Sequence, residues 1–201
     1  MVQTVWGYEI LDDQIPQILT LDEFNALTLN KYASDQRVQS ILNATTASIR
    51  SWCGWHLAGN TECSITYLFD DLHITRTSKG LIIQLPSRCV TSITKILINN
   101  EEVNLFNFVK TNGTLKIYDN CGFFKTITIR FMSGIQNDPA LKSLVAARVS
   151  NVLSGVYGVS SESAGGVSIH YTDSFVAGSN STTLVTADKE YLEPYRIKEL
   201  L

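Results

Sequence analysis

The sequence predicts an α+β fold in which an antiparallel β domain is inserted into a helical bundle of two long helices plus short ones. Apolar residues recur every three or four positions over 38–53, which is the period of a helix with one buried stripe. Over 63–132 the period changes to two, and the helical period returns over 141–157. Because each long helix has one apolar stripe to bury, we expect the two helices to pack on each other.

The first elements are marked by their caps. Residues 1–19 show no clear period and are predicted to form an extended N-terminal arm. The capping box Thr20-Leu-Asp-Glu23 predicts a short helix over 21–27, since each of the two outer side chains accepts the other residue's backbone N–H. A second cap at Ser34 is predicted to begin the first long helix, which Gly54 ends.

Short runs rich in Ile, Val, Thr, Phe and Tyr follow, separated by turns that contain Asp, Asn or Gly. This spacing predicts an antiparallel β-sandwich or small barrel. The predicted strands cover 63–69, 74–77, 80–85, 90–98, 103–109, 114–118 and 123–132. Asp138-Pro139 then supplies an N-cap and a first-turn proline for the second long helix, which Gly158 ends.

These elements divide the chain into four parts. The predicted parts are an N-terminal arm (1–19), a helical core (20–56 and 137–158), an inserted β domain (57–136) and an extended C-terminal arm (159–201).

The C-terminal arm is the most informative part of the sequence. It is rich in Gly and Ser, and its one alternating run, which can form a strand, has the apolar positions Val167, Ile169 and Tyr171. Its last, amphipathic segment carries Tyr191, Leu192, Tyr195 and Ile197. Pro194 limits helix there to one or two turns. Since a short segment gains little by folding alone, we interpret the arm as a docking arm whose apolar residues are buried by another subunit or partner. The alternative is a last helix that packs back on its own core.

Composition argues against several classes of function. The 201-residue chain has a formal net charge of −3 and no cluster of Lys and Arg, which argues against a surface that grips nucleic acid. It opens with no basic and apolar leader, and no run approaches the roughly 18 apolar residues of a membrane span, so we expect an aqueous compartment. The four cysteines form no C-x-x-C pair and the three histidines lie far apart, so no metal and no cofactor is expected.

No residue pattern supports catalysis, and we predict that the protein is not an enzyme. Ser92 and Lys95 match a pattern of serine acyl-enzymes, but they lie in a predicted strand, where positions three apart point to opposite faces. Asp70, Asp71 and His73 fit a solvated hairpin tip better than a cation site.

Several stretches of the chain resemble one family of virus proteins. They are the capped helix at 20–27, Ile49-Arg-Ser-Trp-Cys-Gly54, Leu85-Pro-Ser-Arg-Cys-Val-Thr-Ser-Ile93, Ile98-Asn-Asn-Glu-Glu102, Asp138-Pro-Ala-Leu-Lys142, Val159-Ser-Ser-Glu-Ser-Ala-Gly-Gly-Val-Ser-Ile169 and Leu192-Glu-Pro-Tyr-Arg196. Together they resemble the head-tail connector proteins of tailed bacteriophages, also called adaptors or head completion proteins. The resemblance covers almost the whole chain from about Thr20, and the chain departs from the smallest family members by its full β insertion.

The resemblance implies a structural virion protein of the neck, assembled in the host cytoplasm. Its copies would form a ring, usually dodecameric, beneath the portal, where it extends the DNA channel and offers the tail attachment site. The implied partners are the portal protein, neighbouring copies, a stopper or tail protein below, and genomic DNA that passes without specific binding. The implied portal-binding residues are Tyr191, Leu192, Tyr195, Arg196 and Ile197.

Two alternatives of other classes stay open. One is a carbohydrate- or surface-binding β module of a virion, indicated by Trp55 and the tyrosines; Trp52, by contrast, falls on the helical stripe and is predicted to lie in the core. The other is a hydrolase that uses Ser92 or a Ser/His pair.

Overall fold

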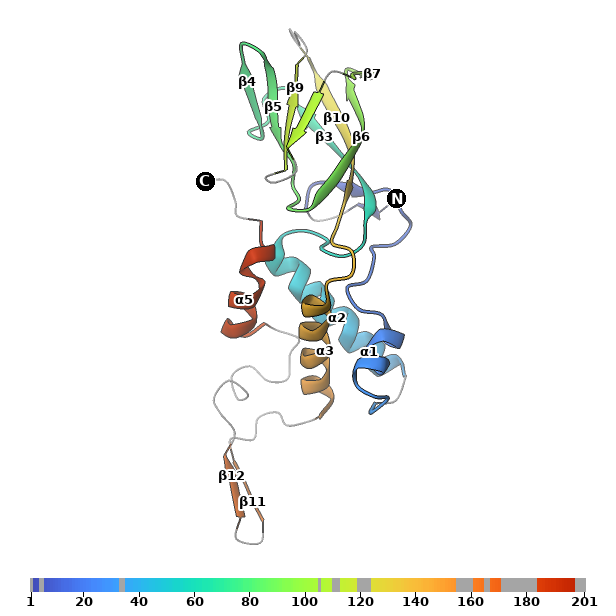
Figure 1. The fold of residues 1–201 in the computed structure, drawn as a ribbon, viewed down its shortest axis with the longest axis vertical. Coiled ribbons are helices and arrows are strands. Elements are labelled where there is room, and N and C mark those ends of the chain that lie inside the picture. Colours follow the sequence, from blue (N-terminus) through green and yellow to red (C-terminus); the bar gives the residue numbers. More distant parts are fainter. Residues whose placement is uncertain are drawn as a thin grey trace. The chain divides into compact units, whose positions relative to one another are not determined.

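The computed structural model describes residues 2–3, 6–32, 35–104, 106–109, 113–118, 124–154, 161–164, 167–170 and 184–197. The fold is α+β, with a packed helix pair and two antiparallel sheets. The chain divides into two compact units. A β unit comprises Met1–Pro16, Gly54–Asn137 and Tyr195–Leu201, and a helical unit comprises Gln17–Cys53 and Asp138–Pro194 (Figure 1).

The helical unit begins with the predicted capped helix. Helix α1 (Leu21–Leu27) has the full capping box, in which Glu23 N–H donates to Thr20 Oγ1 at 3.3 Å and Thr20 N–H donates to the Glu23 carboxylate at 3.0 Å. Helix α2 (Gln36–Cys53) is capped by Asp35, whose Oδ1 accepts the Val38 N–H at 2.9 Å. The cap of α2 is therefore one residue later than Ser34, which lies outside the described residues.

Helix α3 (Pro139–Ser154) begins as predicted, because Asp138 Oδ1 accepts the N–H groups of Ala140 and Leu141. Helices α2 and α3 pack on each other, as their stripes predict. The buried apolar residues of the pair are Val38, Leu42, Ile49 and Cys53 from α2 and Leu141, Val145, Ala146 and Val149 from α3. The predicted extension of this helix to Gly158 lies outside the described residues.

An ion pair joins α1 to α3. Lys142 Nζ lies 2.6 Å from Glu23 Oε1. The pKa of the Glu23 carboxyl is below its ordinary value, first because of this hydrogen bond from Lys142 and second because of the Thr20 N–H. Charge pairing and capping thus hold the same carboxylate in its ionised form.

The β unit contains two antiparallel sheets. In the first, the strand order is β1-β2-β3-β10-β6-β7, and in the second it is β4-β5-β9-β8. The strands of the first sheet are β1 (Val2–Gln3), β2 (Glu9–Ile10), β3 (Thr61–Leu68), β10 (Thr126–Ser133), β6 (Val90–Ile98) and β7 (Glu101–Glu102). Those of the second are β4 (Ile74–Thr77), β5 (Gly80–Gln84), β9 (Thr114–Ile117) and β8 (Phe106–Val109).

The start of the chain belongs to this sheet and is not a separate arm. Strand β2 pairs with β3, so that Glu9 lies opposite Ser64 and Ile10 opposite Cys63. Ile10 is fully buried and Tyr8 is 2% exposed, so both are core residues of the β unit. The prediction of an arm over 1–19 is therefore corrected for this segment.

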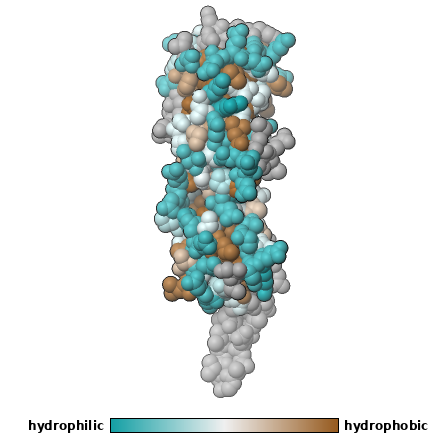
Figure 2. Space-filling view, turned by 90° about the vertical axis from the view of Figure 1, so that its right-hand side faces the viewer, coloured by the Kyte–Doolittle hydropathy of each residue, from teal (hydrophilic) through white to brown (hydrophobic). Residues whose placement is uncertain are grey.

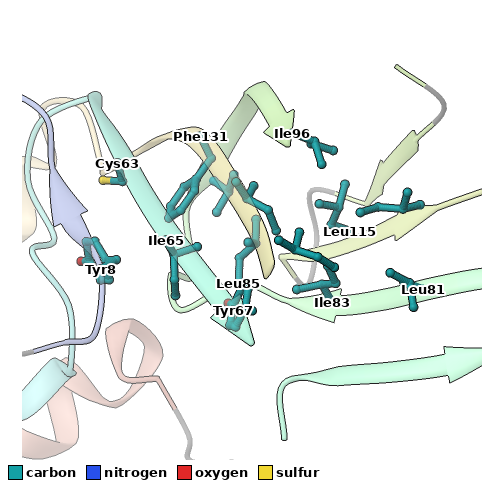
Figure 3. Packing of buried hydrophobic residues seen from close by; sticks show 14 of the residues in the cluster. Tyr8, Cys63, Ile65, Tyr67, Leu81, Ile83, Leu85, Ile96, Leu115 and Phe131 are labelled. Atoms are coloured by element: carbon teal, nitrogen blue, oxygen red, sulfur yellow. The ribbon is translucent and has the colours of Figure 1, made fainter. Parts of the chain in front are cut away.

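The two sheets share one hydrophobic core. Figure 3 shows Ile65 and Phe131 of the first sheet packed near Ile83 and Leu115 of the second. Phe131, Ile83 and Leu115 are all 0% exposed.

Figure 2 shows a face on which hydrophilic side chains predominate and hydrophobic ones occur in small groups. No helix in the described part of the chain combines the length and apolar character that a membrane crossing requires.

Candidate functional site

The end of the chain forms a short helix and a turn. Helix α5 (Thr186–Leu192) is followed by a 3-10 turn, η2 (Glu193–Tyr195), that contains Pro194. Seven residues make about two helical turns, the length that the proline predicts. Upstream, β11 (Ser161–Ala164) and β12 (Val167–His170) form their own antiparallel hairpin. Val167 and Ile169 lie in β12, and Tyr171 lies outside the described residues.

Helix α5 packs against the helical unit through apolar and charged contacts. It packs on α2, and Leu192 is fully buried. The Arg148 guanidinium of α3 forms an ion pair with the Asp188 carboxylate, whose Oδ2 also accepts the Val185 N–H at 3.0 Å. The side chains of the pair are only 20% and 10% exposed. Because a half-broken buried pair leaves an uncompensated charge, this contact fixes where α5 docks.

A cation–π contact adds to this docking. Lys189 Nζ lies 4.9 Å from the ring centroid of Trp52 on α2. Trp52 is half-buried, so the prediction that it lies in the core is met only in part.

The residues after α5 are held by the β unit through their backbone. Trp55 Nε1 donates to the Tyr195 carbonyl at 2.6 Å, and Arg88 Nη1 donates to the Arg196 carbonyl at 3.0 Å. Ile197 lies beside Gly54, where an added Cβ atom would be 3.8 Å from Ile197 Cβ. Since both donors bind carbonyl oxygens, they fix the path of the backbone and leave the Arg196 side chain exposed.

Trp55 belongs to a buried loop with a strained turn. Trp55, His56 and Leu57 are all 0% exposed. Ala58 N–H donates to the His56 carbonyl at 2.8 Å, which makes a three-residue γ-turn with Leu57 at its centre, at φ 66°. A left-handed backbone costs a leucine about 1 to 2 kcal/mol, a cost that the burial of this side chain offsets. Trp55 is buried, which corrects the idea that it is exposed for ligand stacking.

His56 anchors this loop to the start of the chain. Its Nε2 lies 3.1 Å from the Ser133 carbonyl, which can only accept, so Nε2 carries the proton. Nδ1 lies 2.7 Å from the Tyr8 hydroxyl, and the His56 backbone N–H donates to the same Tyr8 oxygen at 3.1 Å. His56 thus faces a serine carbonyl, whereas the Ser133 hydroxyl lies 2.5 Å from that of Ser87.

The structure places the proposed acyl-enzyme residues differently from the sequence prediction. A bulge in β6 puts Ser92 opposite Met132 and Lys95 opposite Arg130, two positions of β10 that share a face. Ser92 and Lys95 therefore lie on the same face, and the prediction of opposite faces is wrong. The Lys95 ammonium lies 3.3 Å from the Glu102 carboxylate.

The acidic hairpin tip is stabilised by its own turn. Asp71 Oδ1 accepts the His73 N–H at 3.0 Å. Over the described ranges, no three His, Cys, Asp or Glu side chains are grouped so as to hold a metal ion.

The predicted portal-binding residues differ in their exposure. Tyr191 is 43% exposed, Arg196 is exposed, and Tyr195 and Ile197 are half-buried. Leu192 is 0% exposed and is buried by its own chain. Leu192 lies on α5, and the packing of α5 on α2 buries its side chain within the same chain. The inference that this side chain needs a partner for burial is therefore corrected.

Comparison with known proteins gives no further guide. No family model matches the sequence, and a search of curated proteins finds no match.

Proposed function

We propose that the protein is a structural component of a tailed-phage neck, a ring-shaped head-tail connector that lies beneath the portal, extends the DNA channel and offers the tail attachment site. The stretches that resemble this family include α1, the end of α2, the start of α3 and the α5–η2 segment, and in chain order two antiparallel sheets lie between α2 and α3. The role requires no catalysis, cofactor or metal. The protein would act in the virion after assembly in the host cytoplasm.

The observation that carries the proposal is the C-terminal segment, whose two parts are each held by contacts within their own unit. Helix α5 is fixed by Leu192 and Asp188, and the following backbone is fixed by Trp55 and Arg88. Tyr191 on α5 and Arg196 on the backbone after it are each held within their own unit, so each presents its outward side chain without a large loss of conformational entropy on binding.

Tyr191 and Arg196 are the proposed portal contacts with the greatest exposure. Tyrosine and arginine are the residue types that most often dominate interface energies, and Arg196 would meet a portal carboxylate in a charge-assisted pair. Tyr195 and Ile197 would add contacts at the edge, and Leu192 would position the helix from inside. Tyr191, and not the buried Leu192, is therefore the proposed main contact of α5 with the portal.

The ring would form from neighbouring copies around a channel. A chain with net charge −3 suits a lumen through which DNA slides without being held, since tight binding needs clustered cations. In the helical unit, the exposed apolar side chains Leu27 (53% exposed) and Leu29 (89% exposed) are the proposed contacts with a neighbouring copy. Such small contacts are marginal alone, so we expect the free chain to be monomeric and to form rings on the portal. A stopper or tail protein would bind below.

A portal-capture experiment tests this function. Immobilised portal rings should retain the wild-type chain and should lose most of it when Tyr191→Ala and Arg196→Ala are combined. The control is Thr186→Ala, an exposed position on the same helix that should leave capture unchanged. Equal capture of the double variant would contradict the assigned contacts, and no capture of the wild-type chain would contradict the function. The carbohydrate-binding alternative is not proposed, because its main support, Trp55, is buried.

A further inference from the structure

We infer that neighbouring copies contact each other through two different patches, each of which lies within one compact unit of its chain. The basic patch lies in the helical unit and consists of Leu27, Leu29 and Lys31. The acidic patch lies in the β unit and consists of Leu68, Asp70, Asp71 and Leu72. The basic patch of one copy binds the acidic patch of the next. The inference rests on the proposed ring and names the surface of the neighbouring copy that receives Leu27 and Leu29.

The leucines of the two patches are the four most exposed large apolar side chains in the described part of the chain. Leu72 is 97% exposed and Leu68 is 58% exposed. Single apolar side chains on a surface are common, but each patch places two of them on one short stretch of backbone. Grouped apolar side chains that remain in water are typical of an interaction site.

The basic patch lies at the end of α1, where hydrogen bonds hold the backbone. Leu29 N–H donates to the Ala26 carbonyl at 3.3 Å, and Lys31 N–H donates to the Thr28 carbonyl at 3.1 Å. Leu29 has a left-handed backbone, φ 53°, which costs a leucine stability relative to glycine or asparagine. Since Leu29 is 89% exposed, burial within its own chain does not offset this cost. Backbone strain of this kind is typical of functional positions.

The acidic patch lies on two consecutive turns between β3 and β4. Asp71 N–H donates to the Leu68 carbonyl at 3.1 Å and closes the first turn, and Ile74 N–H donates to the Asp71 carbonyl at 3.1 Å and closes the second. Leu72 lies on the second turn, where the Asp71 side chain also accepts the His73 N–H. These hydrogen bonds hold the backbone of both leucines in place before a partner binds, which lowers the entropic cost of binding.

The charges of the two patches are opposite in sign. Neither Lys31 nor Asp70 has an ion-pair partner among the residues that the structure describes. The cation that follows the acidic patch, Arg76, is engaged elsewhere, because its Nη2 donates to the Phe69 carbonyl at 3.0 Å and its guanidinium lies 3.4 Å from the centroid of the Phe69 ring. Opposite charges steer the two patches together, and like charges disfavour contact between two acidic or two basic patches. The charges therefore select a contact between different patches.

A contact between two different patches suits a ring. Each copy then has one patch for the copy before it and one for the copy after it, which is the heterologous arrangement that closes into a ring. Two leucines on each side bury much less area than the roughly 1,200 to 2,000 Å² of a stable interface. The contact is therefore weak in the free chain and becomes stable where the portal holds the copies side by side.

Disulfide trapping tests the contact. A chain that carries Leu29→Cys is mixed with a differently sized chain that carries Leu72→Cys, at high concentration and under mild oxidation, both free and on portal rings. We expect a disulfide-linked heterodimer on a non-reducing gel. Each variant alone should form no more disulfide-linked dimer than the wild-type chain, which measures the background from the native cysteines. Leu27→Cys replaces Leu29→Cys if circular dichroism shows that the latter does not fold.

Thr75→Cys is the matched control for Leu72→Cys. Thr75 is an exposed position on β4, three residues beyond Leu72 and outside the acidic patch. Mixed with the Leu29→Cys chain, it should give only the background. An equal yield of heterodimer with Thr75→Cys would contradict the assigned patch, because it would indicate random collisions.

Charge reversal tests the pairing of the two patches. Lys31→Glu added to the Leu29→Cys chain should lower the yield of heterodimer several-fold, and so should Asp70→Lys added to the Leu72→Cys chain. When both reversed chains are mixed, opposite charges face each other again, and the yield should return. Yields that none of these reversals changes would overturn the inference that charge selects the contact.

The outcomes separate the contact from the connector function. Rings that form on the portal without any heterodimer, or with homodimers of one variant in its place, would overturn the contact and leave the function standing. Heterodimers trapped in the free chain, together with no ring on the portal, would support the contact and overturn the function.

Discussion

Leu192→Ala tests whether the C-terminal segment is part of the folded chain or a free arm. Leu192 is 0% exposed and lies at the end of α5, which packs on α2. The change removes about three carbon groups at about 0.8 kcal/mol each, and the cavity that remains adds to this loss. We expect a loss of about 3 kcal/mol in the free energy of unfolding. For a chain of this size, the midpoint of thermal unfolding would fall by about 6 to 12 °C.

The assay is urea unfolding followed by circular dichroism at 222 nm, with Trp fluorescence as the second probe because Trp52 contacts α5 through Lys189. Tyr191→Ala is the matched control. Its side chain is the adjacent one, 43% exposed, and we expect a change within about 0.5 kcal/mol. A Leu192→Ala protein as stable as the wild type would refute the reasoning and return Leu192 to the class of partner-buried anchors.

Three further predictions follow from single contacts. Glu23→Gln should destabilise the protein above pH 4.5, the ordinary pKa of Glu, and should have little effect once the pH falls below the lowered pKa of the folded state. Urea unfolding at pH 7 and at pH 3 measures the difference. An equal loss of stability at the two pH values would contradict this prediction. Trp55→Phe keeps a smaller aromatic ring but removes the 2.6 Å donor to the Tyr195 carbonyl, so limited proteolysis near the C-terminus should become several-fold faster with circular dichroism unchanged. Unaltered cleavage would show that this hydrogen bond does not hold the segment. Leu29→Asn should raise the free energy of unfolding by about 0.5 kcal/mol, because Leu29 is 89% exposed at φ 53° and asparagine tolerates that backbone. Leu29→Ala, the control, should not raise the free energy of unfolding.

Local signals predict the helices of this protein well. The capping box at Thr20 and the cap at Asp138 are formed by side chains within three residues of the backbone groups that they bind. The stripe of α2 likewise depends only on spacing along the chain. Where two capping residues are adjacent, as at Ser34 and Asp35, sequence spacing does not distinguish them, and the structure selects Asp35.

Features that depend on contacts between distant residues could not be predicted from the sequence. Strand β2 has two residues and no period of its own, and it exists because Glu9 and Ile10 pair with β3. The bulge that brings Ser92 and Lys95 to one face depends on the register with β10. Trp55 is buried next to a left-handed Leu57, for which the sequence carries no signal.

The C-terminal segment was predicted in part. Its apolar residues and the limit set by Pro194 identify a two-turn helix from the sequence. Periodicity shows that Leu192 needs burial, but it does not show whether its own chain or a partner supplies the surface. Leu192 is 0% exposed within the single chain and α5 packs on α2, so its own chain supplies that surface.

The central claim is that this chain forms a ring on a portal. Electron microscopy of portal rings incubated with an excess of the purified chain, with the mass of the complex measured by sedimentation velocity, tests it most directly. The account predicts an added ring of density, coaxial with the portal, and a complex heavier by one full ring of 22.3 kDa copies. Portal rings of unchanged shape and mass, with the chain sedimenting alone, would contradict it.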